Sequence, residues 1–212
     1  MNSEPAFLER LYDRIFQLAL PSLQTRENES HTKIAHAFAE RLLSREGGDR
    51  SIVVPAILLH DVGWSRVPEH LQLLAFGPHM SRPELRDVHE REGAEMARAI
   101  LAEVGYPAEK VELIARIVSR HDSRQDADCL EEAIVKDADK LYRFSPGGFS
   151  VWAMRFGLPE AEYLSRLERW IGRWFLTATG RRIARTEALA RRREIGTKAD
   201  GSKDSSLVCT GR

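Results

Sequence analysis

The sequence has little cysteine and no long hydrophobic run. Its two cysteines, Cys129 and Cys209, form neither a Cys-x-x-Cys pair nor a disulfide framework, as is typical of proteins in a reducing compartment. The longest uncharged apolar run, residues 52–59, is too short to span a bilayer. Charged residues stand near the N-terminus, where an export signal needs an apolar stretch. We therefore expect a soluble, cytoplasmic protein that does not bind a membrane.

An excess of charge of either sign is also absent. The 212 residues carry 32 Lys and Arg against 32 Asp and Glu, which excludes a strong overall field toward nucleic acid or an anionic membrane. Of the basic residues 26 are Arg and 6 are Lys, and Arg is the residue suited to bidentate contacts with carboxylate or phosphate. An Arg-rich stretch at residues 181–193 is short and interrupted by Glu187. Specific nucleic-acid binding is therefore not expected.

Helical periodicity dominates the chain, and no alternating strand pattern is present. We predict one all-α domain, with Ser30 and Ser51 as N-caps of two of its helices. Residues 64–86 contain several Pro and Gly and read as an irregular segment. Residues 1–26 are expected to pack on the core, residues 146–194 to complete the same domain, and residues 195–212 to form a disordered tail. The predicted helices cover residues 7–19, 30–43, 51–59, 87–104, 108–120, 130–142, 149–156, 160–178 and 181–193.

Six polar residues fall on apolar helix faces, where the periodicity turns their side chains inward. A buried polar group without a partner costs roughly 1–3 kcal/mol, and an unpaired carboxylate costs more. A domain with about 5–15 kcal/mol of stability cannot carry six such groups unpaired. Imidazole and carboxylate are ligands of divalent metals, so a shared metal site resolves the conflict. The six are His31, His60, Asp61, His89, His121 and Asp139, whereas His36, His70 and His79 are predicted to lie at the surface.

The order and spacing of these residues resemble a known family. His31, then His60-Asp61-Val62-Gly63 after an apolar helix, then Asp137-Ala138-Asp139-Lys140-Leu141 resembles the HD-domain superfamily of metal-dependent phosphohydrolases, over about residues 27–145. The resemblance implies an HD-type helical bundle with the metal site between core helices. It implies that His31, His60, Asp61 and Asp139 hold a primary metal. In dinuclear members, His89 and His121 would hold a second ion, with Asp61 bridging the two.

The cyclic-dinucleotide phosphodiesterase subfamily is disfavoured. Asp122 stands where that subfamily has the second His of a pair. Arg124-Gln125-Asp126 also differs from its Gly-Tyr-Pro motif.

This resemblance predicts a phosphomonoesterase or phosphodiesterase that uses one or two Mn, Fe, Co or Mg ions. The expected substrate is a small phosphorylated metabolite, a nucleotide being favoured, attacked by metal-activated water. Asp61 would ligate metal and orient that water, and Lys140 would meet the substrate phosphate. Residues 64–86 are the expected lid and specificity loop. The candidate phosphate clamps are Arg82, Arg86, Arg120 and Arg124.

Two alternatives stay open. Four His and two Asp also resemble the ligand set of mixed-valent di-iron oxygenases built on the HD fold, although the 18 residues from His121 to Asp139 are fewer than usual there. The other alternative is a non-enzymatic regulatory module that keeps its metal for structure and binds a partner through residues 181–193. The sequence leaves the oligomeric state open, a homo-oligomer included.

Overall fold

The computed structural model describes residues 4–78 and 80–206, and within these ranges it contains ten α-helices, short 3-10 turns and no strand. The predicted all-α fold is therefore confirmed. The α-helices are α1 Glu4–Ala19, α2 Asn28–Glu46, α3 Arg50–Leu59, α4 Glu69–Gln72, α5 Glu84–Glu103, α6 Ala108–Val118, α7 Leu130–Leu141, α8 Pro146–Arg155, α9 Glu160–Trp174 and α10 Ala178–Ser206. The 3-10 helices are η1 Leu20–Leu23, η2 Val62–Arg66, η3 Leu73–Ala75 and η4 Tyr142–Phe144.

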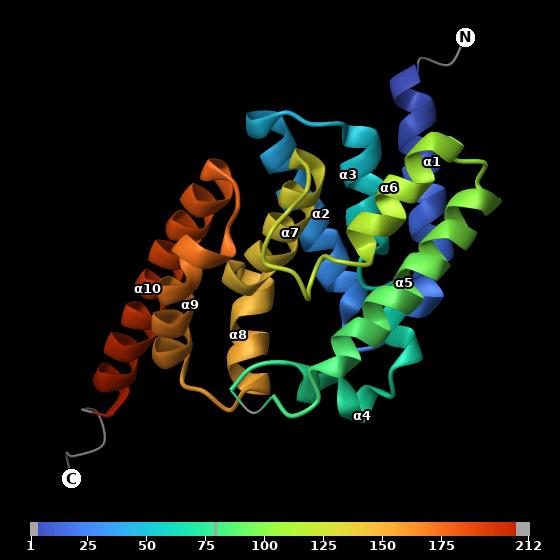
Figure 1. Ribbon diagram of the computed structural model, residues 1–212. Helices are drawn as coiled ribbons and strands as arrows, with labels where there is room; N and C mark the ends of the chain where they lie inside the picture. The colour runs from blue at the N-terminus through green and yellow to red at the C-terminus, as the bar shows by residue number, and fades with distance from the viewer. Residues whose placement is uncertain (1–3, 79, 207–212) are drawn as a thin grey trace.

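The helices pack around one continuous apolar core. Figure 1 shows α2 and α7 at the centre, with α1, α5 and α6 on one side and the pair α9 and α10 on the other. The apolar helix α3 packs against α1, α2, α6 and α7, which explains why nearly all of its side chains are buried. The predicted ligands lie on or just after helices of this central group, so the fold brings their positions together.

The starts of α2 and α3 differ from prediction. Helix α2 begins at Asn28, two residues before the predicted N-cap Ser30, after Glu27 in the left-handed conformation. Helix α3 is capped by Asp49, whose carboxylate accepts a hydrogen bond of 2.8 Å from the Ser51 backbone N–H. The predicted N-caps Ser30 and Ser51 are therefore both wrong. Asp49 takes the second role because its carboxylate reaches the free N–H groups of the first turn.

A proline inside α3 is accommodated by a contact from a distant loop. Pro55 has no N–H to donate to the carbonyl of Ser51, four residues earlier. The hydroxyl of Tyr106 donates to that carbonyl instead, at 2.5 Å. The helix thus continues through Pro55 to Leu59, which leads directly into His60 and Asp61.

Helices α8 and α10 begin or end at other residues than the sequence predicted. Helix α8 begins at Pro146, three residues before the predicted helix 149–156, because the hydroxyl of the N-cap Ser145 accepts from the Gly148 N–H at 3.0 Å. Helix α10 begins at Ala178 and runs to Ser206. Residues 195–206, predicted from the sequence to belong to a disordered tail, are thus helical in the structure, and residues 207–212 lie outside the described ranges. Ile195 packs on the core and Lys198 pairs with Glu160 of α9, which extends the helix past the predicted end.

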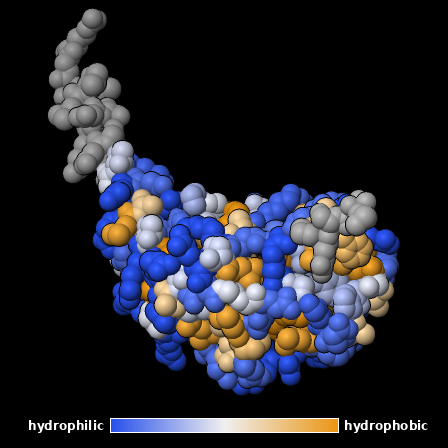
Figure 2. All heavy atoms as spheres, turned by 90° about the horizontal axis from the view of Figure 1, so that it is seen from above, coloured by the Kyte–Doolittle hydropathy of each residue, from blue (hydrophilic) through white to orange (hydrophobic). Residues whose placement is uncertain are grey.

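The surface is mixed in polarity. Figure 2 shows polar residues over much of one face, with apolar residues in small groups between them. None of the helices in the described ranges combines the length and the apolar character that crossing a bilayer requires.

Candidate metal centre

The ends of three helices bring four of the predicted ligands together. His31 lies in the first turns of α2, His60 and Asp61 directly follow α3, and Asp139 lies near the end of α7. His60 and Asp61 are buried, His31 is nearly so, and Asp139 is largely shielded. Such burial is unfavourable for polar groups unless they bind one another or an ion.

Backbone contacts aim two of the histidines at the cluster. The Nδ1 atom of His60 lies 2.7 Å from the Ile57 carbonyl oxygen, and Nδ1 of His121 lies 2.8 Å from that of Val118. A carbonyl accepts only, so each Nδ1 carries a proton and Nε2 is the ring nitrogen that faces the cluster. A histidine fixed through Nδ1 in this way can bind a metal through Nε2 once that atom is deprotonated.

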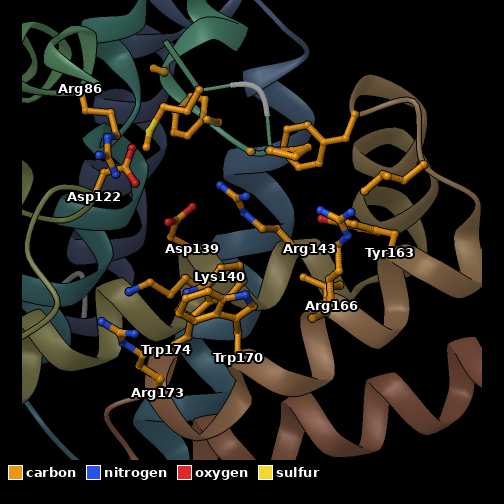
Figure 3. Close-up of a pocket in the computed structure, with 18 of the residues that line it drawn as sticks. Arg86, Asp122, Asp139, Lys140, Arg143, Tyr163, Arg166, Trp170, Arg173 and Trp174 are labelled. Atoms are coloured by element: carbon orange, nitrogen blue, oxygen red, sulfur yellow. The ribbon is translucent and has the colours of Figure 1, made fainter. Parts of the chain in front are cut away.

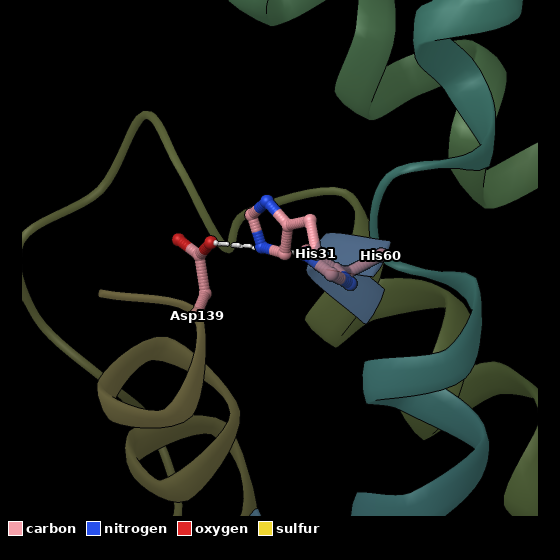
Figure 4. A group of neighbouring side chains, drawn as sticks. All are labelled: His31, His60 and Asp139. Carbon is pink, nitrogen blue, oxygen red and sulfur yellow. Dashed lines mark hydrogen bonds and ion pairs between the residues drawn. The ribbon is translucent and has the colours of Figure 1, made fainter. Parts of the chain in front are cut away.

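His31, His60 and Asp139 form the first donor group. The Nε2 atoms of His31 and His60 are 3.2 Å apart, and His31 Nε2 lies 3.0 Å from Asp139 Oδ1 (Figure 4). Two nitrogen lone pairs at that separation repel unless a proton or a cation lies between them. Ligands about 2.0–2.2 Å from one ion are themselves about 3–3.6 Å apart, so the donor spacing fits one divalent ion.

Asp61 joins this group to a second one, formed by His60, Asp61 and His121, whose ligand atoms lie within 4.8 Å of one another. Oδ2 of Asp61 lies 3.7 Å from His60 Nε2, and Oδ1 lies 3.8 Å from His121 Nε2. The two carboxylate oxygens thus face different histidines. This placement fits the bridging role that the resemblance implied for Asp61.

His89 lies beside the second group, outside both sets of closely spaced donors. Its ring stacks on Trp64 at a centroid distance of 4.1 Å and meets the edge of His121 at 4.9 Å. The side chain is completely buried, and neither ring nitrogen forms a hydrogen bond within the described part of the chain. A buried imidazole with two free nitrogens is a costly group, and a nearby ion would satisfy it.

A glycine pair allows His89 to approach so closely. A Cβ atom at Gly63 would lie 1.9 Å from the His89 carbonyl oxygen and 2.6 Å from the Gly93 nitrogen. Only glycine therefore lets η2, which follows Asp61, pack against the backbone of α5. The Gly63 that closes the motif positions the second half of the centre.

The loop after His121 is fixed by two buried charged side chains. The Glu90 carboxylate accepts from the backbone N–H groups of Asp122 and Ser123 at 2.7 and 2.9 Å. Lys136 is completely buried, pairs with Glu132 at 2.8 Å and also binds the Asp126 carbonyl of the same loop. Both contacts restrict the position of His121.

The carboxylates of the cluster are ionised. Burial raises the pKa of Asp61, but the charge of His60 and a contact with His121 outweigh it and hold the pKa well below its usual value. Burial also raises the pKa of Asp139, but contacts with His31 and His60 outweigh it and hold the pKa well below its usual value. Burial also lowers the pKa of His89, assisted by the charge on His121. Burial opposes the charged forms of His60 and His121 as well, but Asp61 outweighs it, so the pKa of His60 is raised and that of His121 is raised to about 9. A divalent cation requires anionic carboxylate and neutral imidazole, and would therefore displace these protons on binding.

The residues present therefore fit a divalent first-row metal. Nitrogen and oxygen donors without thiolate suit Mn, Fe, Co or, with more oxygen ligands, Mg.

A pocket of about 500 Å³ opens beside Asp139 (Figure 3). Asp139 and Lys140 of α7 lie at its inner end, and Arg86 and Asp122 lie on one side. Helix α9 forms the opposite side with Arg166, Trp170, Arg173 and Trp174. Residues 75–78 and Met80, from the segment expected to act as a lid, line the pocket as well.

Of the predicted phosphate clamps, only Arg86 lines this pocket. Arg82 pairs with its neighbour Glu84, Arg124 pairs with Asp126 at 2.7 Å, and Arg120 pairs with Asp128 and Glu132. These three are engaged by acidic residues close in sequence. The pocket does not include them.

The pocket contains functional candidates that the sequence did not reveal. Arg143 lies four residues after Asp139 and therefore one turn farther along the same face, a spacing that could have identified it. Arg173, Trp170 and Trp174 come from α9 and approach only through tertiary packing. Tyr142, which stacks on the ring of His31 at 4.3 Å, was also missed.

The other histidines were predicted to lie at the surface. His70 is exposed, and His36 is partly buried and faces Glu40 at 3.4 Å. His79 lies outside the described residues.

The fold and the donor groups define an all-α protein with clusters of His and Asp between core helices that could hold a metal ion. A model of the HD domain family matches residues 29–143, over half of the chain. The chain therefore belongs to the HD domain family, a family of metal-dependent hydrolases. Among solved structures it is similar to a predicted HD superfamily hydrolase from an uncultured Thermotogales bacterium, with 20% identity, a TM-score of 0.60, and coverage of 88% of this chain and 90% of that one. No curated protein matches it.

Proposed function

We propose that this protein is a metal-dependent phosphomonoesterase or phosphodiesterase acting on a small phosphorylated metabolite, with a nucleotide as the favoured class. The observation that carries the proposal is the position of Asp139. It belongs to the first donor group and also lines the pocket, whose other walls carry Lys140, Arg143 and Arg173. A substrate in the pocket therefore meets cations and the metal ligand together.

A bound divalent ion supplies two effects, polarising a phosphoryl oxygen and lowering the pKa of a bound water to about 7. The chain supplies the rest. Asp61, held ionised, can accept a hydrogen bond from the attacking water and orient it.

Lys140 is the first candidate to bind the phosphate. Its side chain is buried, and within the described ranges its Nζ forms no hydrogen bond. Burial lowers its pKa, while Asp139 and Asp137 act in the opposite direction. A buried ammonium that lines a pocket and lacks a partner is suited to receive an anion.

Arg143 is the second candidate. Its guanidinium lies 4.4 Å from the Trp152 ring and 5.7 Å from the Trp174 ring, contacts that stabilise a cation without occupying its hydrogen-bond donors. No carboxylate pairs with it among the residues that the structure describes. The donors of Arg143 thus remain available to a substrate anion.

Aromatic side chains favour a substrate with a planar ring. Trp170 and Trp174 stack on each other with centroids 5.8 Å apart, and both line the pocket. Trp170 is 40% exposed, so one face of this pair is accessible. Stacking on an aromatic side chain contributes roughly 1–3 kcal/mol per base, which supports a nucleotide over a purely aliphatic phosphate.

The proposal is tested by assaying phosphate release from nucleoside monophosphates and polyphosphates, and the formation of mononucleotides from dinucleotides, with the protein loaded separately with Mn, Co, Fe and Mg. We expect metal-dependent hydrolysis of at least one nucleotide. Metal analysis in parallel tests the alternatives. Two irons per chain together with oxygen uptake would indicate the di-iron oxygenase, and metal-loaded protein inert toward the whole panel would indicate the regulatory module.

A further inference from the structure

A strained turn precedes the first metal ligand. Arg26 and Glu27 have φ angles of 49° and 62°, and they are the non-glycine residues with positive φ in the described ranges. Two consecutive non-glycine residues in the left-handed region cost energy and persist only where surrounding contacts enforce them. The turn leads into α2 and is five residues from His31.

Side chains from two other elements hold this turn. The backbone N–H of Arg26 donates to the Glu69 carboxylate of α4 at 3.3 Å. The Arg26 carbonyl accepts from the Arg155 guanidinium of α8 at 2.8 Å, and Arg155 also lies 3.4 Å from the Glu27 carboxylate. Both backbone polar groups of Arg26 are thus engaged by charged side chains, which fixes the direction of its side chain.

The Arg26 side chain is directed toward the metal centre. Its guanidinium carbon lies 4.5 Å from the Trp64 ring, the ring that stacks on His89, and 5.3 Å from the ring of Phe76, which lines the pocket. Arg26 therefore lies where the wall of the metal centre meets the wall of the pocket.

The Arg26 guanidinium has hydrogen-bond donors without a partner. Its Nε and Nη1 atoms are buried and form no hydrogen bond with the described part of the chain. Burial lowers the pKa of Arg26 to about 10, with Asp61 acting in the opposite direction, so the group is charged at neutral pH. A buried cation with unsatisfied donors is costly unless an anion completes it.

We propose that Arg26 is an anion-binding residue of this site, whose guanidinium receives phosphate oxygens next to the metal centre. The proposal rests on the proposed function, because it names a residue that would hold the substrate's phosphate. Two observations carry it together: the enforced left-handed turn and the unpaired donors between Trp64 and Phe76. The aromatic contacts leave the edge of the guanidinium free for a bidentate contact with phosphate.

A purely electrostatic role makes a different prediction. If Arg26 only balanced the charge of Asp61, lysine would replace it without loss, because it carries the same charge. A forked contact is lost in lysine, which presents a single ammonium. The substitutions Arg26→Lys and Arg26→Gln therefore separate the two roles, and Arg66→Gln, in an exposed arginine of η2, is the matched control.

The experiment measures the affinity of the metal-loaded protein for inorganic phosphate by titration calorimetry, with the metal content of every variant determined in parallel. We expect about ten- to hundredfold weaker phosphate binding in Arg26→Gln, at least about tenfold weaker in Arg26→Lys, unchanged binding in Arg66→Gln and unchanged metal content throughout. Failure of the native protein to bind phosphate, or an Arg26→Lys affinity within about twofold of the native value, would overturn the proposal. Arg26→Lys keeps the charge and serves as the test if Arg26→Gln does not fold.

Phosphate binding is measured without turnover, so the two proposals fail separately. A native protein that binds phosphate through Arg26 yet hydrolyses no phosphoester would refute the proposed function and leave the anion site. Phosphoester hydrolysis together with unchanged phosphate affinity in the Arg26 variants would support the proposed function and refute the role of Arg26.

Discussion

The carboxylate of Asp137 holds Thr177, forty residues farther along the chain, by two hydrogen bonds. Oδ2 accepts from the Thr177 backbone N–H at 2.9 Å and from its hydroxyl at 2.7 Å, and Oδ1 accepts from the Leu176 N–H at 2.8 Å. Asp137 lies two residues before the ligand Asp139, and Thr177 lies directly between α9 and α10. This contact thus fixes the pocket wall formed by α9 relative to the metal centre.

Replacement of Asp137 by Ala is expected to destabilise the protein by roughly 2–4 kcal/mol, because three donors lose a buried charged acceptor. The measurement is chemical denaturation. Thr177→Val removes the hydroxyl bond to Asp137 and also the acceptor of the Gly180 N–H at 2.9 Å, and should cost about 1–2 kcal/mol. Equal stability of Asp137→Ala and the native protein would show that α9 and α10 are held by packing alone.

Asp61→Asn is expected to abolish both metal-dependent hydrolysis and full metal occupancy, since the amide cannot supply two anionic oxygens to the donor groups. The readouts are metal content per chain and phosphate release, with circular dichroism to verify folding. Asp126→Asn, at an exposed position, is the control and should retain both. Unchanged turnover in folded Asp61→Asn would refute the assigned role.

Removal of metal by a chelator is expected to lower the melting temperature. A ligand that binds the folded state stabilises it by RT ln(1 + [L]/Kd), about 2.7 kcal/mol at a hundredfold excess over Kd. Without the cation, a proton must lie between the His31 and His60 nitrogens, which are 3.2 Å apart, or the two rings must separate. Thermal denaturation with chelator and after readdition of Mn gives the comparison, and a melting temperature insensitive to both would speak against a metal centre.

Trp170→Ala is expected to raise KM several-fold for a nucleotide substrate while leaving KM for an aliphatic phosphate unchanged. The reason is that stacking requires a planar ring, and Trp170 is exposed enough for its loss to spare the core. Leu189→Ala, at an exposed position of α10 outside the pocket, is the control. Parallel increases for both substrate classes would contradict base stacking at this position.

Glu46 should make a pH-dependent contribution to stability. Its carboxylate accepts from the Thr179 N–H at the start of α10 at 2.7 Å, and the side chain and backbone of Thr179 together lower its pKa below 4.5. The contribution is therefore complete above about pH 4.5 and is lost as pH falls through the lowered pKa. Because solvent screens this site, Glu46→Gln should cost no more than about 1 kcal/mol at pH 7, and denaturation curves of the two proteins should converge in acid.

The inward placement of the candidate ligands could be predicted from the sequence because each side chain is directed by its own helix. The periodicity that turns His60 inward is a local property of α3, which ends directly before it, and His60 is buried in the structure. The His31, His60 and Asp139 group follows once α2, α3 and α7 pack together. The periodicity correctly predicted that His89 is buried. Its distance from the two donor groups depends on the close contact between Gly63 and Gly93, which helical periodicity cannot predict.

The pocket could not be predicted because its walls meet through distant contacts. The start of α10 is set by Asp137, and the Arg26 turn is held by Glu69 and Arg155, all far away in sequence. Arg82 and Arg124 lie close to candidate ligands in the sequence, yet each has an acidic neighbour two residues away that engages it. Nearby acids were visible in the sequence and could have excluded both.

The shared membership of His60 in both donor groups has a consequence for metal loading. Its Nδ1 is occupied by the Ile57 carbonyl, so only one lone pair faces the centre, and one lone pair binds one ion. The two groups therefore compete for His60, and two ions cannot be held equivalently. Titration with metal should give stepwise affinities, with one tightly held ion and a second, exchangeable one retained mainly by Asp61 and His121. A preparation made with one equivalent of metal would then consist mainly of chains that hold one ion, rather than of equal numbers of chains that hold two ions and none.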